Sequence, residues 1–156
     1  GHNFAMYPSD CFITAGDCSL PMVEIAKKRA EEIQDQGAKI AAVVVMDAEN
    51  LKYPNNCFDT VVDTFGLCSF EDPVKSLMEM KRVCRKEGQI LLLEHGRSSW
   101  SAVSRLLDRS AKQHACRWGC WWNRNIEEIV QKAGLQIVEI RKVHLGTTYF
   151  IVAKPA

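Results

Sequence analysis

Segments rich in strand-forming residues alternate with segments of helical periodicity along nearly the whole chain, and this alternation most limits the possible folds. Continuous apolar runs such as Ile40–Met46 and Ile90–Leu93 are typical of strands covered on both faces. Strands of this kind occur in parallel sheets that have helices above and below. The alternation therefore predicts an α/β fold built on a mostly parallel sheet.

The predicted elements follow one another without a long linker. Strands are predicted at Cys11–Asp17, Ile40–Met46, Phe58–Thr64, Gln89–Glu94, Leu135–Arg141 and Tyr149–Ala153. Helices are predicted from Ser19 to Gly37, from Pro73 to the turn at Glu87-Gly88, at Ser99–Gln113 and at Asn125–Ala133. Asp72 before Pro73, and Asn125 with Glu128, are typical helix N-caps, and Gly134 is typical of a helix end.

Helical spacing also predicts which side chains face the core. In the first helix the apolar stripe consists of Met22, Ala26, Ala30 and Ile33. In the second helix the stripe consists of Val74, Leu77, Met80 or Lys81, and Val83-Cys84.

The connection between the last two predicted strands is short, at His144–Thr147. A parallel crossover needs a dozen or more residues, so these two strands should be antiparallel neighbours. A parallel sheet that ends in an antiparallel strand differs from the all-parallel sheet of the dinucleotide dehydrogenases. The absence of a Gly-x-Gly-x-x-Gly turn also disfavours a nicotinamide-dependent oxidoreductase.

Composition excludes several classes of protein. A length of 156 residues predicts a single domain over residues 1–156. A net charge of +1 gives no general electrostatic reason for binding nucleic acid or an anionic membrane. No apolar run approaches the roughly 20 residues of a membrane span. Seven cysteines, an odd number without a regular spacing, indicate free thiols in a reducing, intracellular compartment.

Polar residues stand at the ends of the predicted strands, where ligands bind in open α/β sheets. Asp17 ends the first strand, and its two oxygens can accept both hydroxyls of a ribose. Asp47 can accept from an adenine amine while the backbone at Ala48 meets a ring nitrogen, and Met22 can pack on the adenine face. The competing interpretation is that the aspartates are only helix caps and that Met22 belongs to the core.

Five stretches of sequence occur in a characteristic order: Gly16–Met22, Asp47–Leu51, Phe58–Leu67, Glu79–Val83 and Gly88–Gly96. In this order the chain resembles the class I S-adenosylmethionine-dependent methyltransferases, in the group around the ubiquinone/menaquinone C-methyltransferases (methyltransferase type 11). The resemblance covers essentially the whole chain and depends on order and spacing. It implies a Rossmann-like sheet, mostly parallel, with an antiparallel last strand.

The resemblance also implies a site and an activity. Asp17 would hold the ribose of S-adenosylmethionine and Asp47 with Ala48 the adenine, and Cys18 and Met22 lie beside them. Thr64 would contact the methionine portion, and Gly1 would be the surviving edge of a glycine-rich loop. The implied reaction transfers a methyl group to a small, lipophilic acceptor in an intracellular location, cytoplasmic or mitochondrial. His95 is the candidate general base by position, although a histidine after a strand is often only a surface residue.

The chain departs from the family at its beginning. Members of the family start with a strand that runs into a glycine-rich turn, and here only Gly1 corresponds to that turn. The missing strand would lie between the strands Cys11–Asp17 and Phe58–Thr64, so the sheet is expected to be incomplete at its N-terminal part. Either the chain is a piece of a longer protein, or another segment fills the gap, or the flanking strands pair directly. The first of these is the expectation.

Two further expectations follow from the incomplete sheet. Unpaired strand edges favour association, so a homodimer through these edges is one expectation. An incomplete cofactor pocket would also fit a non-catalytic binding module, which is the alternative to the enzyme.

All four tryptophans lie in the segment Ser98–Asn123, as Trp100, Trp118, Trp121 and Trp122. One interpretation is a hydrophobic lid over the lipophilic acceptor, and another is that one or two of them close the end of the core. Interleaved basic residues would also suit single-stranded nucleic acid, which the neutral overall charge disfavours. These basic residues are Arg105, Arg109, Lys112, Arg117 and Arg124.

His114, Cys116 and Cys120 raise the question of a metal site. A structural zinc site uses four ligands, usually in close pairs, whereas this cluster offers three at irregular spacing. We therefore expect these thiols to pack in the interior, and no metal is predicted.

Overall fold

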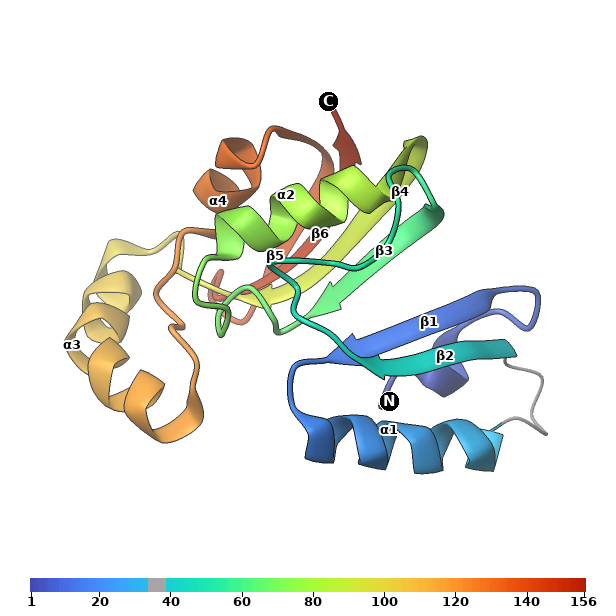
Figure 1. The fold of residues 1–156 in the computed structure, drawn as a ribbon. Coiled ribbons are helices and arrows are strands. Elements are labelled where there is room, and N and C mark those ends of the chain that lie inside the picture. Colours follow the sequence, from blue (N-terminus) through green and yellow to red (C-terminus); the bar gives the residue numbers. More distant parts are fainter. Residues whose placement is uncertain (34–38) are drawn as a thin grey trace. The chain divides into compact units, whose positions relative to one another are not determined.

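The computed structural model describes residues 1–33 and 39–156 (Figure 1). The chain divides into two compact units, Gly1–Asn50 and Leu51–Ala156. Gly37, predicted to end the first helix, lies outside the described residues. A single domain over residues 1–156 stays a prediction.

The first unit is a two-stranded sheet with a helix packed against it (Figure 1). Its elements are η1 (Phe4–Met6), β1 (Phe12–Asp17), α1 (Leu20–Ile33) and β2 (Lys39–Val45). The two strands are parallel, from the pair Phe12 and Lys39 to the pair Asp17 and Val45. Both strands therefore end at the same edge of this sheet.

The core of the first unit joins η1 to α1. Phe4, Ala26 and Ala30 form its buried cluster, and Val23 is only 1% exposed. Met22 is 46% exposed, so the predicted stripe is wrong at this position. Val23, Ala26 and Ala30 stand at i, i+3 and i+7, and this spacing places Met22 beside the buried face rather than on it.

The expectation that β2 is covered on both faces is also wrong. No residue of β2 is fully buried: each is either half-buried or exposed, and Val45 is 52% exposed. Within the described part of this unit, α1 is the helix that packs on β2, and it covers one face of the sheet (Figure 1).

The second unit contains a four-stranded sheet. Its elements are β3 (Phe58–Thr64), α2 (Pro73–Val83), β4 (Cys84–His95), α3 (Ser101–Trp118), α4 (Ile126–Lys132), β5 (Leu135–Val143) and β6 (Thr148–Pro155). The strand order is β3-β4-β6-β5. β3 is parallel to β4, whereas β6 is antiparallel to both β4 and β5. The predicted antiparallel final pair is confirmed, as is the α/β fold class.

Local sequence explains where the helices of this unit begin and end. The Asp72 side chain accepts a hydrogen bond from the Lys75 backbone N–H at 3.0 Å, and Pro73 is the first helical residue of α2. The Asn125 side chain accepts from the Glu128 N–H at the start of α4. Both predicted N-caps are therefore confirmed. Gly134, at φ +70°, follows α4 in the left-handed conformation that favours glycine.

Helices α2 and α4 lie over one face of the sheet (Figure 1). The side chains of Ile90 and Leu92 are buried on that side, at 0% and 3% exposure. The opposite face of the sheet carries a shallow groove of about 320 Å³, which is lined in part by Leu91, Leu93 and Phe150. The run Ile90–Leu93 is thus fully buried on one face only, which corrects the prediction of a strand covered on both faces.

The bounds and burial of several predicted elements differ from the structure. Helix α2 ends at Val83, and Cys84 already belongs to β4, so the predicted turn at Glu87-Gly88 is wrong. The chain can continue as a strand because Gly88 lies close to β3: a Cβ there would be 2.6 Å from the Asp59 backbone oxygen. The predicted burial of β3 is wrong at Val62, which is 38% exposed because it borders the groove on the face opposite α2 and α4.

Other predicted bounds are too long or too short. β1 begins at Phe12 rather than Cys11, β2 ends at Val45 rather than Met46, and α4 ends at Lys132 rather than Ala133. Helix α3 continues to Trp118, past the predicted end at Gln113, and both β5 and β6 are longer than predicted. No helix in the described ranges 1–33 and 39–156 combines the length and the apolar character that crossing a membrane requires.

Candidate functional site

The two aspartates predicted to bind the nucleoside lie at the ends of neighbouring parallel strands. Asp17 is the last residue of β1 and pairs in register with Val45, the last residue of β2. Asp47 follows β2 by two residues. Both side chains are exposed, and each makes the same local contact: Asp17 Oδ1 accepts from the Ser19 N–H and Asp47 Oδ1 from the Glu49 N–H, both at 2.8 Å.

These local hydrogen bonds orient the carboxylates. Each is a turn in which the side chain binds the backbone two residues further on, which is common where a strand ends. One oxygen of each carboxylate is thereby fixed, so that the group is held in one orientation at the edge of the sheet. The arrangement suits hydroxyl or amine donors of a ligand.

The approach to this edge depends on Gly16. A Cβ at Gly16 would lie 2.2 Å from the Met46 side chain, so Met46 packs directly on the backbone of β1 next to Asp17. Gly1 also belongs to this region: its amino group has a lowered pKa, first through burial and then through Arg29, whereas Asp17 raises it. Gly1 therefore lies close enough to Asp17 for their charges to interact.

The remaining predicted residues of this edge differ in exposure. Cys18 and Met22 are exposed, and Ala48 is half-buried in the turn that closes when the Asn50 N–H donates to the Asp47 carbonyl at 3.1 Å. The exposed side chain of Met22 is available to pack on a ligand. The competing interpretation, that Met22 belongs to the core, is wrong.

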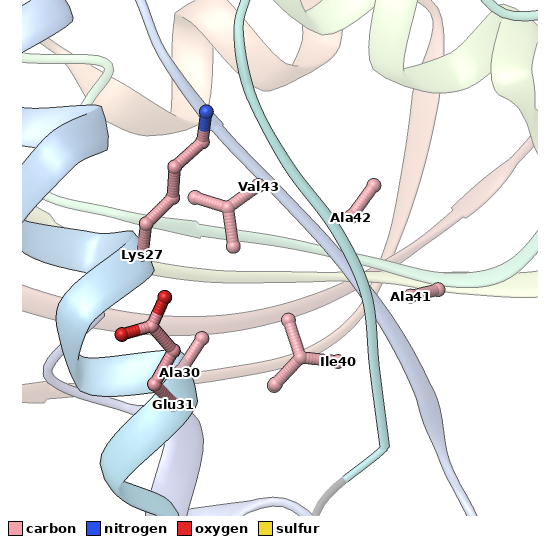
Figure 2. A pocket seen from close by; sticks show the side chains of 7 residues that line it. All are labelled: Lys27, Ala30, Glu31, Ile40, Ala41, Ala42 and Val43. Carbon is pink, nitrogen blue, oxygen red and sulfur yellow. The ribbon is translucent and has the colours of Figure 1, made fainter. Parts of the chain in front are cut away.

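A groove of about 230 Å³ lies elsewhere in the first unit, between α1 and β2. Figure 2 shows Ile40 and Val43 of β2 directed toward α1, where Lys27 and Glu31 border the groove. None of the predicted site residues lines it. The strand ends that carry Asp17 and Asp47 are therefore separate from this groove.

In the second unit the predicted residues Thr64 and His95 end the paired strands β3 and β4. Thr64 is half-buried and pairs with Leu93, and His95 is exposed. The His95 ring stacks on Phe65, with ring centroids 4.2 Å apart. Partial desolvation of the ring lowers the pKa of His95, with further lowering from His114 and His144, so its imidazole is neutral at pH 7 and able to accept a proton.

A pair of buried carboxyl groups lies beside these strand ends, and sequence reasoning did not single it out as a pair. Glu94 is 0% exposed, and burial followed by the Asp63 charge raises its pKa to about 9. Burial also raises the pKa of Asp63 to about 6. Within the part of the chain that the structure describes, Asp63 Oδ2 and Glu94 Oε2 have no other polar partner. A proton held on Glu94 supplies the hydrogen bond between them.

Gly66 completes this arrangement. Its N–H donates to Glu94 Oε1 at 3.2 Å, and a Cβ at this position would lie 2.2 Å from Asp63 Oδ1. The sequence does indicate this pair: Asp63 and Glu94 are each the next-to-last residue of a strand, and the two strands are neighbours.

The four tryptophans have different environments. Trp100, Trp118 and Trp121 are 61%, 66% and 42% exposed. Trp122 is half-buried, stacks on His114 at 3.7 Å between ring centroids, and donates from Nε1 to the Leu107 carbonyl. Three exposed indoles on one segment suit a lid, and the role of that segment stays a prediction.

The metal cluster considered in the sequence does not come together. Cys116 is exposed, whereas Cys120 is buried, and His114 Nδ1 donates to the Cys120 carbonyl at 2.9 Å. Cys120 instead lies near Cys68 and His95.

Comparison with known proteins identifies the class and then the family. A geranyl diphosphate methyltransferase, solved in complex with SAM, has the same fold, with a TM-score of 0.75 over 94% of this chain and 69% of that chain, at 12% identity. The fold is thus that of the class I methyltransferases. Residues 1–92 match the family model described as "Methyltransferase domain", and the chain belongs to this family.

Relatives by sequence support the predicted group. The mitochondrial methyltransferase OMS1 of Saccharomyces cerevisiae is 39% identical over 155 residues, covering 91% of this chain and 33% of that protein. A ubiquinone/menaquinone biosynthesis C-methyltransferase of Coxiella burnetii is 28% identical over 108 residues, covering 69% of this chain and 42% of that protein. The predicted resemblance to this group is confirmed.

A phosphatidylethanolamine N-methyltransferase of Cereibacter sphaeroides is 29% identical over 142 residues, covering 89% of this chain and 67% of that protein. The chain thus spans about a third of the yeast relative and two thirds of this bacterial one.

Proposed function

We propose that this chain binds S-adenosylmethionine and transfers its methyl group to a small, lipophilic acceptor. The observation that carries the proposal is the pair of exposed carboxylates, Asp17 and Asp47, at the same edge of two parallel strands. Ligands of open α/β sheets bind at this edge. Membership of the methyltransferase domain family identifies the ligand class.

Each residue of the edge has a distinct task in this proposal. Asp17 accepts the two ribose hydroxyls, and Asp47 accepts from the adenine amine while the backbone at Ala48 meets a ring nitrogen. Met22, exposed beside Asp17, packs on the adenine face. Gly1 and Cys18 border the same edge, and Gly1 allows a ligand to approach the backbone closely.

The cofactor supplies a methyl group that is already activated on a sulfonium, so the protein has mainly to align the acceptor with it. Thr64 is assigned to the methionine portion of the cofactor. His95, neutral at pH 7, is the candidate to take a proton from an acceptor that must lose one.

A lipophilic acceptor is supported by two observations. The relatives include enzymes named for quinone and phospholipid methylation. In this chain Trp100, Trp118 and Trp121 present exposed indoles on one segment, which can cover an apolar acceptor and exclude water.

Three broader predictions belong with this proposal. The two units act together as one methyltransferase domain, and the mitochondrial relative favours the mitochondrial alternative among the predicted locations. Association through unpaired strand edges predicts a homodimer, which light scattering of the purified chain tests.

Titration calorimetry with S-adenosylhomocysteine tests the binding step, and transfer of a radiolabelled methyl group to a ubiquinone precursor or to phosphatidylethanolamine tests the reaction. Asp17→Asn and Asp47→Asn should each weaken binding at least tenfold, because each loses about 1.5–3 kcal/mol of charged hydrogen bonding. Asp10→Asn, an exposed turn residue before β1, is the matched control.

The outcomes separate the enzyme from the non-catalytic alternative. Binding together with transfer supports the proposal. Binding without transfer to either acceptor favours a binding module, and no binding by the folded chain refutes the proposal.

A further inference from the structure

Three potential metal ligands that are far apart in the sequence come together in the second unit. Cys68 lies in the loop after β3, His95 is the last residue of β4, and Cys120 follows α3. One ligand atom from each side chain lies within 4.8 Å of the others. We propose that Cys68, His95 and Cys120 bind one Zn²⁺ ion, whose fourth position is taken by a water molecule.

Backbone hydrogen bonds hold the two cysteines near each other. The Trp121 N–H donates to the Cys68 carbonyl at 2.7 Å, which joins the residue after Cys120 directly to Cys68. Arg124 donates from the same segment to the carbonyls of Leu67 and Phe70, on either side of the loop. The two thiols therefore face each other because their segments are connected, independently of any ion.

The imidazole is fixed by different contacts. The His95 ring stacks on Phe65, whose N–H donates to the Leu93 carbonyl at 2.8 Å. His114 Nδ1 donates to the Cys120 carbonyl and orients that residue from the outside. Such outer hydrogen bonds are typical of metal sites, because they hold the ligands in place before the ion arrives.

The ligand set selects the metal. Two sulfurs and one imidazole nitrogen suit zinc, which binds thiolate at about 2.3 Å and imidazole at about 2.0 Å in tetrahedral geometry. Tetrahedral ligand atoms at these bond lengths are about 3.5–3.8 Å apart, so the three side chains need to close by about 1 Å or less. Carboxylate-preferring ions such as Mg²⁺ have no suitable donor among these three residues.

The environment allows an ion to enter. Cys68 and Cys120 are buried, whereas His95 is exposed, so the ion reaches the thiols from the His95 side. Binding displaces the two thiol protons into solvent, and the neutral imidazole binds through its lone pair. Water from the same side completes the tetrahedron.

The ion has a structural consequence for the predicted lid. Cys120 directly precedes Trp121 and Trp122, so an ion on Cys120 ties this tryptophan segment to the ends of β3 and β4. The inference goes beyond the proposed methyl transfer, and metal binding is measured without cofactor or acceptor. A His95 lone pair bound to Zn²⁺ cannot also accept a proton, so with the ion in place His95 is a ligand and not the base.

The test uses the full 156-residue chain, purified under reducing conditions and stripped with a chelator. Zn²⁺ added back should bind with one ion per chain by elemental analysis, and Co²⁺ should give the visible absorption of a tetrahedral site with thiolate ligands. Cys120→Ser, Cys68→Ser and His95→Ala should each weaken binding more than about 100-fold, because losing even an outer hydrogen-bond partner weakens metal binding 10–100-fold.

Matched controls use cysteine and histidine residues outside the cluster. Cys116→Ser, on the exposed end of α3, and His144→Asn should bind the ion as the unaltered chain does. His95→Cys replaces one zinc ligand by another at an exposed position, so it should retain an ion that His95→Ala loses. This pair keeps the test informative if the buried serine variants fail to fold.

Three results would overturn the inference. The first is a folded chain that binds no Zn²⁺ at micromolar concentration. The second is binding that persists equally in His95→Ala and Cys120→Ser, which would show only adventitious metal. The third is a Cys68–Cys120 disulfide, found by mass spectrometry, that persists under reducing conditions and leaves no thiols for the ion.

Discussion

Arg82 organises the loop that precedes β3, and replacing it by lysine should destabilise the second unit. The guanidinium donates to both carboxylate oxygens of Glu79, to the backbone carbonyls of Leu51 and Tyr53, and to the Asn55 side chain, at 2.7–2.9 Å. Glu79 in turn accepts from the Leu51 N–H at 2.9 Å. A lysine keeps the charge but cannot span these five contacts, because its donors radiate from one nitrogen.

The magnitude follows from the contacts that are lost. A lysine at this position retains about two of the hydrogen bonds, so about three are lost at roughly 0.5–1.5 kcal/mol each. The side chains of Arg82 and Glu79 are 30% and 21% exposed, so water replaces part of the loss. Arg82→Lys should therefore lower the free energy of unfolding by about 2 kcal/mol.

The assay is urea unfolding followed by tryptophan fluorescence, since all four tryptophans lie in the second unit and report on it. Arg85→Lys is the matched control, because the ion pair of Arg85 with Asp59 is exposed and should contribute less than about 1 kcal/mol. Equal unfolding free energies for the two variants would refute the reasoning.

The effect of Arg82→Lys should also depend on pH. The hydrogen bond from Arg82 lowers the pKa of Glu79, so the stabilisation is present above the ordinary carboxyl pKa near 4.3. It is lost as the pH falls through the lower folded value, so the two proteins should converge in stability in acid.

Three further predictions concern stability and ligand binding. Burial raises the pKa of Asp63 to about 6, so the folded Asp63 carboxyl contributes a loss of about 2 kcal/mol in unfolding free energy between pH 4 and pH 7. Buried Glu94 adds a loss of its own, so Asp63→Asn should reduce the pH dependence without abolishing it, and unfolding at both pH values measures the difference. Val23→Ala should destabilise the first unit by about 2 kcal/mol in thermal unfolding followed by circular dichroism, whereas Met22→Ala should change stability by less than about 0.5 kcal/mol and weaken binding of S-adenosylhomocysteine. Gly16→Ala should destabilise the same unit by about 1–3 kcal/mol, because its methyl group would displace Met46, and an unchanged melting temperature would contradict this packing.

The parts of the fold that depend on local chemistry could be predicted from the sequence. The Asp72-Pro73 pair begins α2 for two reasons. The Asp72 side chain accepts from the backbone N–H three residues further on, and Pro73 has no N–H that would be left without a partner in the first turn. The short connection before β6 forces an antiparallel pair, as the register with β5 shows.

Errors arose where the result depends on neighbours elsewhere in the chain. The predicted stripe on α1 is wrong at Met22, because Val23 takes the core position instead. Adjacent residues point about 100° apart around a helix, so Met22 faces away from the core. Helical spacing predicts that Cys84 belongs to α2, but pairing with Phe58 makes it the first residue of β4. Strand burial was overpredicted because an apolar run does not reveal whether a second layer covers it.

The candidate site shows the same division. Asp17 and Asp47 could be singled out because strand ends are readable from the sequence. The burial of Glu94 against Asp63 could not, because a charged residue after a strand is usually exposed. The cluster of Cys68, His95 and Cys120 depends on how the loop after β3 folds back, which no spacing in the sequence records.

The central claim is that the Asp17 carboxylate, at the end of β1, accepts hydrogen bonds from the ribose hydroxyls of S-adenosylmethionine. Calorimetric titration of the unaltered chain and Asp17→Asn with S-adenosylhomocysteine, and with an analogue whose ribose lacks both hydroxyls, measures that contact directly. The account predicts that the unaltered chain prefers the natural ligand by at least about tenfold and that the variant shows no preference. An equal preference in both proteins, or none in either, would contradict it.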